Sequence, residues 1–130
     1  MITSVLLFSC QAEEKLFNDV NEIAEFDTVY KPILIQSGKE SGTLESIMKY
    51  SIFSIDSLGF QNLESSVIKS NKFKEGKYYL NIELDDYLNK NKLSIINMSK
   101  CSITKNKYDK TYNLYLLSDK NTFVICQINH

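Results

Sequence analysis

The feature that most constrains the fold is a pair of segments on either side of a short polar turn. Both segments are rich in apolar residues and in residues that favour β-strands. The segments are Thr111–Leu117 and Thr122–Ile128. The four residues between them, Ser118–Asn121, have the composition of a hairpin loop. The C-terminal part of the chain is therefore predicted to be an antiparallel hairpin.

Two more strands are expected before this hairpin. Residues 77–84 alternate apolar and polar side chains, which is the pattern of a half-buried strand. Residues 85–92 are a polar connection, and residues 93–103 form the next strand. Together with the hairpin, these segments predict a meander of about four strands.

The N-terminal half has mostly helical spacing. Three segments are expected to be helical: residues 13–26, a helix that Thr43 caps and that runs to Ile55, and residues 61–70. Residues 33–35 include two β-branched isoleucines and predict a short strand, and residues 37–42 have the composition of a loop. The last part of the second helix, residues 50–55, could also be extended. The predicted fold class is α+β, with N-terminal helices followed by an antiparallel meander.

The amino-acid composition limits the classes of partner that the chain can bind. The 130 residues fit one domain, and a hydrophobic content of 43% supports a folded core. All 15 basic residues are Lys, and the net charge is -1. Such a chain has neither the positive field that attracts nucleic acid nor the Arg side chains that bind phosphates and bases in pairs of hydrogen bonds. No nucleic-acid partner is expected.

The N-terminus has an apolar run that stops abruptly at a cysteine. Leu6-Leu7-Phe8-Ser9-Cys10 resembles the lipobox of bacterial lipoproteins, although no Lys precedes it. Gln11-Ala12-Glu13-Glu14 resembles the acidic tag that follows the lipidated cysteine in surface lipoproteins of Bacteroidetes-type bacteria. The resemblance implies cleavage before Cys10 and attachment of lipid to it. The alternative is an N-terminal strand or helix in which Cys10 is a small core residue.

This resemblance divides the chain into three parts: a signal peptide (1–9), a lipidated tether (10–18) and one α+β domain (19–130). It implies an outer-membrane lipoprotein of the cell envelope, exposed at the surface, with the membrane as a partner through the lipid anchor.

The cysteines and the single histidine give little support for catalysis. In the expected register Asn113 faces Cys126 and Cys101 lies near Leu114, so the two cysteines are about 9–10 Å apart and on opposite faces. A disulfide needs Cα atoms within about 7 Å, so free thiols are expected. His130 is terminal, which disfavours a Cys–His dyad, and the ligand spacing of a zinc site is missing.

Two groups of side chains are candidate sites. Glu83, Asp85 and Asp86 form the densest carboxylate cluster, at the end of a predicted strand. Tyr79 and Tyr115 are expected on the less apolar faces of the sheet, where tyrosine can serve recognition. A solvated strand end and ordinary strand tyrosines are the simpler interpretations.

The sequence favours a small lipid-anchored binding module, not an enzyme, without cofactor or metal, whose partner is an unknown protein or ligand at the cell envelope. One alternative is an immunity-type protein that binds a toxin. Another is a small hydrolase that uses Glu83, Asp85 and Asp86, which requires a concave surface at that cluster.

Overall fold

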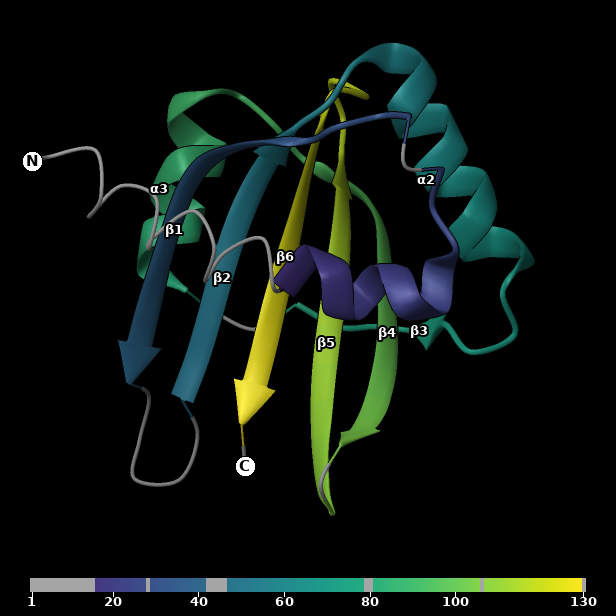
Figure 1. Ribbon diagram of the computed structural model, residues 1–130. Helices are drawn as coiled ribbons and strands as arrows, with labels where there is room; N and C mark the ends of the chain where they lie inside the picture. Colours follow the sequence, from purple (N-terminus) through teal and green to yellow (C-terminus); the bar gives the residue numbers. More distant parts are fainter. Residues whose placement is uncertain (1–15, 28, 42–46, 79–80, 106, 130) are drawn as a thin grey trace, which may run out of the picture.

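The predicted C-terminal hairpin lies within an antiparallel sheet of six strands (Figure 1). The structure is a computed structural model that describes residues 16–27, 29–41, 47–78, 81–105 and 107–129. The strands are β1 (Ile33–Ser41), β2 (Ile47–Ser54), β3 (Lys74–Glu75), β4 (Ile95–Lys105), β5 (Tyr108–Leu117) and β6 (Thr122–Asn129), in the spatial order β1-β2-β6-β5-β4-β3. The helices are α2 (Ser57–Lys69), α3 (Ile82–Lys90) and a helix over residues 16–24.

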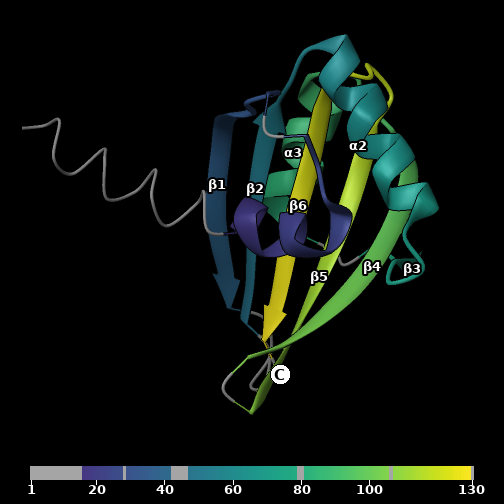
Figure 2. The same cartoon turned by 45° about the vertical axis from the view of Figure 1, so that its right-hand side comes forward.

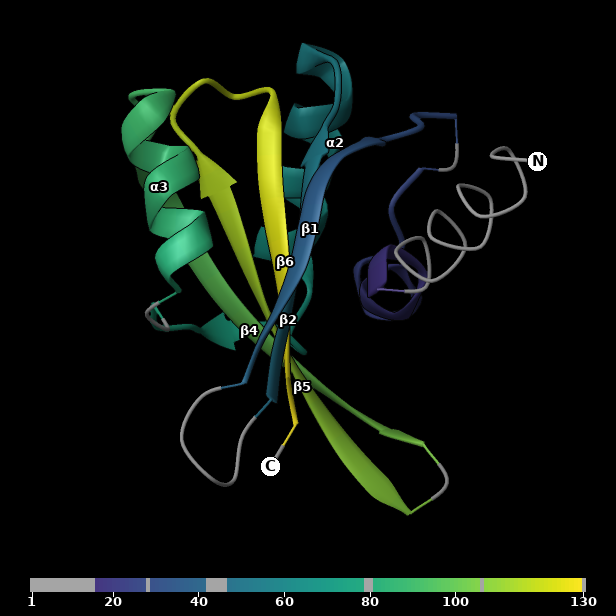
Figure 3. The same ribbon diagram turned by 90° about the vertical axis from the view of Figure 1, so that its left-hand side faces the viewer.

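Helices cover both faces of the sheet, which gives three layers. Figure 3 shows the sheet nearly edge-on, with α3 on one side and with α2 and the 16–24 helix on the other. Figure 2 shows the 16–24 helix crossing in front of the strands on that second side. Two separate hydrophobic cores result. One includes Leu16, Phe60 and Phe123 beneath the two helices, and the other includes Leu84 and Val124 beneath α3.

The prediction for the C-terminal strands is confirmed. β5 and β6 flank the loop at residues 118–121, and Asn113 pairs with Cys126 as expected. Consecutive residues from Tyr112 to Leu117 are all buried, because neighbouring residues of a strand face opposite sides and both sides are covered. The helical prediction for residues 61–70 is also confirmed, although α2 begins earlier, at Ser57 after the cap residue Asp56. Residues 16–24 are helical within the predicted 13–26 segment.

The predicted strand over residues 77–84 is wrong, because residues 82–90 form helix α3. Asn81 caps this helix, and its Oδ1 accepts a hydrogen bond from the Leu84 N–H at 3.0 Å. Leu84 and Leu88, four residues apart, are the buried contacts of α3, whereas Ile82 is 65% exposed. The alternating pattern of residues 77–84, which suggested a strand, therefore extends into the first residues of α3.

The predicted helix from Thr43 to Ile55 is also wrong, since β2 occupies residues 47–54, and the extended alternative for residues 50–55 is confirmed as far as Ser54. Ile52 and Phe53 are both buried, on opposite faces of the sheet, so β2 is apolar on both sides and lacks clear alternation. Thr43 lies outside the described residues. The expected loop at residues 37–42 is likewise part of a strand as far as Ser41, where β1 ends.

These differences change the architecture from the expected four-strand meander to six strands, with α3 inserted before the last three long ones. The folded part also reaches further towards the N-terminus than the predicted boundary at residue 19. Leu16 is buried in the core, and the ring of Phe17 lies 6.0 Å from that of Phe53. The residues of the predicted lipobox and acidic tag, Leu6–Cys10 and Gln11–Glu14, lie outside the described part of the chain.

Candidate functional site

A polar groove lies between the edge strand β1 and helix α3, and we call it the α3 groove. Its volume is about 430 Å³, and its lining residues are Gln36, Glu83, Asp86, Tyr87, Lys90 and Asn91. The groove brings two of the three predicted carboxylates to one concave surface. The α3 groove is therefore the part of the described structure in which carboxylates predicted from the sequence line a cavity.

Helical geometry separates the three acids. Glu83 and Asp86 are three residues apart on α3, so they lie on the same helix face and both line the groove. Asp85 lies on another side of the helix, where its Oδ1 accepts a hydrogen bond from the Tyr78 hydroxyl. The cluster seen in the sequence is thus a pair plus a residue that links α3 to the preceding segment.

A β-bulge at Ile35 brings Gln36 to the groove. Leu34 pairs with Phe53, but Gln36 pairs with Ile52, so Ile35 is an extra residue in β1. Leu34 packs in the core beneath the 16–24 helix, whereas Gln36 points to the α3 side. Without the extra residue, side chains two apart would have shared one face.

Tyr50 of β2 connects the strand wall of the groove to the helix wall. Its hydroxyl donates a hydrogen bond to Glu83 Oε2 at 2.5 Å and accepts one from Gln36 Nε2 at 3.0 Å. Burial raises the pKa of Tyr50 to about 12; the hydrogen bond from Gln36 lowers it, and the Glu83 carboxylate adds to the rise. The phenol is therefore protonated at neutral pH and holds one oxygen of Glu83 in place.

Gly38 leaves the space that this contact occupies. A Cβ atom at position 38 would lie 2.6 Å from Tyr50 Cε1 and even closer to Glu83 Oε2. Real Cβ atoms do not approach other atoms so closely, so any larger residue would displace the Tyr50–Glu83 pair. The sequence had suggested only a loop at this glycine.

The tyrosines predicted for recognition are not part of the groove. Tyr115 is fully buried, so its predicted position on an exposed face is wrong. Its ring packs 5.7 Å from that of Tyr78, and its hydroxyl donates a hydrogen bond to the Lys77 carbonyl at 3.1 Å. Tyr79 lies outside the described residues. The sheet face that carries Tyr115 is covered by α3, which the predicted strand order did not include.

Sequence reasoning missed most of the groove. Gln36, Tyr50, Tyr87, Lys90 and Asn91 were not among the predicted site residues. A bulge and a cross-strand pairing place the first two, and neither leaves a signal in one sequence. The other three follow from the helical period once residues 82–90 are known to be a helix.

The two described cysteines are buried and free, as expected. Cys101 pairs with Tyr112, two residues from the expected Leu114, and it belongs to the opposite core from Cys126. Burial raises the pKa of each thiol to about 12, so neither is a nucleophile at neutral pH. Within the described ranges, no group of three His, Cys, Asp or Glu residues could hold a metal ion.

Among the residues that the structure describes, no helix has the length and apolar content needed to cross a membrane. Comparisons with known protein families, with characterised proteins and with solved structures gave no match.

Proposed function

We propose that the chain is a binding module whose ligand-binding site is the α3 groove. The observation that carries this proposal is the buried Tyr50 hydroxyl, which fixes Glu83 at the wall of a concave surface. A carboxylate has about four acceptor positions, and Tyr50 uses one of them. Glu83 and Asp86 thus offer acceptors to a ligand that donates hydrogen bonds, such as an amine or a polyol.

The walls of the groove favour binding over hydrolysis. A general acid carboxyl needs an apolar, water-poor environment that keeps it protonated near neutral pH. Glu83 and Asp86 are both exposed to water. A small hydrolase remains the second candidate because the two carboxylates line the same cavity, as that function requires.

Binding can be tested by thermal shift and by NMR with a panel of monoamines, diamines and neutral sugars. We expect a saturable effect for at least one class, and a loss of affinity of roughly tenfold in Glu83→Gln, which removes a charge-assisted hydrogen bond. Glu64→Gln in α2, on the other face of the sheet, is the matched control and should bind as the unchanged protein does.

The same variants separate the two candidate functions. Turnover of a glycoside or ester substrate that disappears in Glu83→Gln and in Asp86→Asn would favour the hydrolase. If no probe gives a saturable response at residues of the groove, the binding proposal is refuted.

We also propose that a lipid on Cys10 holds the module at the cell envelope, where it would meet a protein or ligand partner. The support is the lipobox-like sequence Leu6–Cys10 and the acidic residues after it. Intact mass and fractionation of the native protein test this proposal. A soluble, unacylated chain with its N-terminus intact would contradict it.

A further inference from the structure

A second cavity lies on the opposite face of the sheet from the α3 groove, and we call it the aromatic pocket. It has a volume of about 210 Å³ between the 16–24 helix, the segment that follows this helix, and β2. Its lining residues are Phe17, Asn18, Asn21, Phe26, Tyr30, Lys31, Pro32 and Phe53. None of these residues belongs to the α3 groove, so the two cavities are separate.

A tight turn at the end of the helix builds the pocket. Glu25 has φ = 53°, in the left-handed region, and its N–H donates a hydrogen bond to the Asn21 carbonyl at 2.9 Å. The next N–H, of Phe26, donates to Asn21 Oδ1 at 2.6 Å. The turn therefore folds Phe26 back beneath the helix, where its ring meets that of Phe17 edge to face at 5.5 Å.

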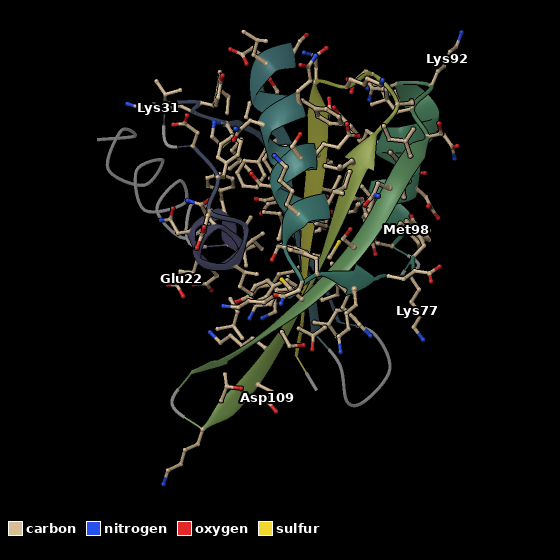
Figure 4. The ribbon with its side chains drawn as sticks, turned by 90° about the vertical axis from the view of Figure 1, so that its right-hand side faces the viewer. Glu22, Lys31, Lys77, Lys92, Met98 and Asp109 are labelled. Carbon is tan, nitrogen blue, oxygen red and sulfur yellow. The ribbon has the colours of Figure 1, made fainter. Side chains whose placement is uncertain are left out.

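The walls of the aromatic pocket are aromatic rings. Its rim carries polar side chains, and those that face inward are uncharged. The rings of Phe26 and Tyr30 lie 6.0 Å apart, and Phe53 closes the pocket from the sheet. Asn18 is exposed at the rim, and the side-chain NH₂ group of Asn21 offers donor positions besides the acceptor that Phe26 uses. Figure 4 shows Lys31 pointing away from the body of the protein, so its charge lies outside the pocket.

These properties limit what can occupy the pocket. A volume of 210 Å³ is below the range of roughly 300–1,000 Å³ that is usual for drug-sized ligands. An anionic group would lose its hydration among the rings, and Lys31 points away from them. Asparagine amides at the rim match the donors and acceptors of a peptide backbone. Val29, which is 72% exposed beside Tyr30, adds apolar surface at the edge.

We propose that the aromatic pocket is a protein-interaction site that takes one uncharged aromatic side chain of an extended peptide segment. The ring packs against Phe17, Phe26 and Phe53, and the peptide backbone on either side of it meets Asn18 and Asn21. Aromatic anchors of this kind supply most of the binding energy of many interfaces. The proposal does not depend on a ligand in the α3 groove.

The pocket can be tested by NMR with capped amino acids as probes for the full chain. N-acetyl-phenylalaninamide should cause saturable amide shifts at Phe17, Asn18 and Tyr30 in the millimolar range. N-acetyl-alaninamide should cause none, and 3-phenylpropionate, which carries a charge in place of the capped backbone, should bind more weakly. Asn18→Ala removes a rim contact at an exposed position and should lower affinity roughly fivefold.

Two further variants, each a Tyr→Leu substitution, distinguish a loss of binding from a general effect on folding. Tyr30→Leu opens one wall and should weaken binding, whereas Tyr87→Leu, in the α3 groove, should leave the affinity for N-acetyl-phenylalaninamide unchanged. The proposal is overturned if this probe gives no saturable shifts at the pocket, or if Tyr30→Leu and Tyr87→Leu bind it equally well. It is also overturned if the same shifts appear on raising the protein concentration without a probe, since a second copy would then fill the pocket.

Discussion

At the scale of single residues, Tyr50 is the side chain on which the α3 groove most depends. It is 1% exposed, yet its hydroxyl reaches Glu83 at the wall of the α3 groove. Only the protonated phenol can donate this hydrogen bond, so the contact with Glu83 is lost at a pH high enough to ionise Tyr50.

The pKa of Tyr50 is raised from 10.0 to about 12 in the folded chain, chiefly by burial. A raised pKa means that the folded state holds the proton more tightly, so this contribution to stability is complete below pH 10 and is lost as the pH rises towards 12. We expect the free energy of unfolding, measured with urea over this range, to fall less in Tyr50→Phe than in the unchanged chain. Equal slopes for the two proteins would argue against this assignment.

Asn113 presents the opposite case, a buried polar side chain that makes no hydrogen bond to the described residues. It is fully buried in β5, and neither its Oδ1 nor its Nδ2 has a hydrogen-bond partner within the described part of the chain. A buried, unpaired polar group costs about 1–3 kcal/mol. We therefore expect Asn113→Leu to raise the free energy of unfolding by about 1 kcal/mol in urea titrations.

Asn81 is the matched control for this substitution. Its Nδ2 is also buried and has no partner among the described residues, but its Oδ1 caps α3. Asn81→Leu should lower stability by about 1 kcal/mol, because the cap is lost. Destabilisation by both substitutions would mean that Asn113 has a role that the fold alone does not explain.

Only part of the candidate site could be predicted from the sequence, as the origins of its individual residues show. Glu83 and Asp86 were found because charge density along the chain is visible without a fold. Gln36 and Tyr50 are fourteen residues apart, and strand pairing with a bulge brings them together, so that Tyr50 can bond both Gln36 and Glu83. Contacts of this kind depend on register, which one sequence does not contain.

At the scale of whole elements, the fold was predictable where local and long-range preferences agree. β5 is rich in Tyr and Leu, β6 is rich in β-branched residues, and a short polar loop joins them, so every local signal favours a hairpin. β2 and α3 were misassigned for opposite reasons. β2 is buried on both faces and loses its alternation, while an alternating stretch of the sequence runs into the first residues of α3.

The end of the 16–24 helix gives a test at this scale. Glu25 adopts a left-handed conformation that favours glycine, because a Cβ atom strains it. We expect Glu25→Gly to raise the free energy of unfolding by about 0.5–1 kcal/mol in urea titrations. Glu22→Gly, inside the helix, should lower it by about 1 kcal/mol. If both substitutions destabilise equally, the turn is not the strained point that the backbone indicates.

At the scale of the whole molecule, two helical layers bury the described thiols completely. Cys101 and Cys126 are 3% and 0% exposed. The chain contains 3 cysteines, so a thiol reagent distinguishes them by accessibility.

We expect Cys101 and Cys126 to react only after unfolding, because both thiols are buried and protonated at neutral pH. In the native protein a lipidated Cys10 would give no rapid reaction, so one rapidly reacting thiol would contradict the proposed anchor. Counting rapid and slow thiols before and after denaturation therefore checks both the buried cores and the proposed anchor. Rapid reaction of Cys126 would contradict the position of α3 over its face of the sheet.

The pairing of β2 with β6 also determines when the protein can fold. Residues 55–121 separate these two strands, yet they are hydrogen-bonded neighbours near the centre of the sheet. While the chain emerges from the ribosome, β2 has only β1 beside it, and its other edge stays open until β6 has been synthesised. The sheet can therefore close only once β6 has been synthesised, and until then the unfinished β1–β2 hairpin is the segment that a chaperone would have to protect.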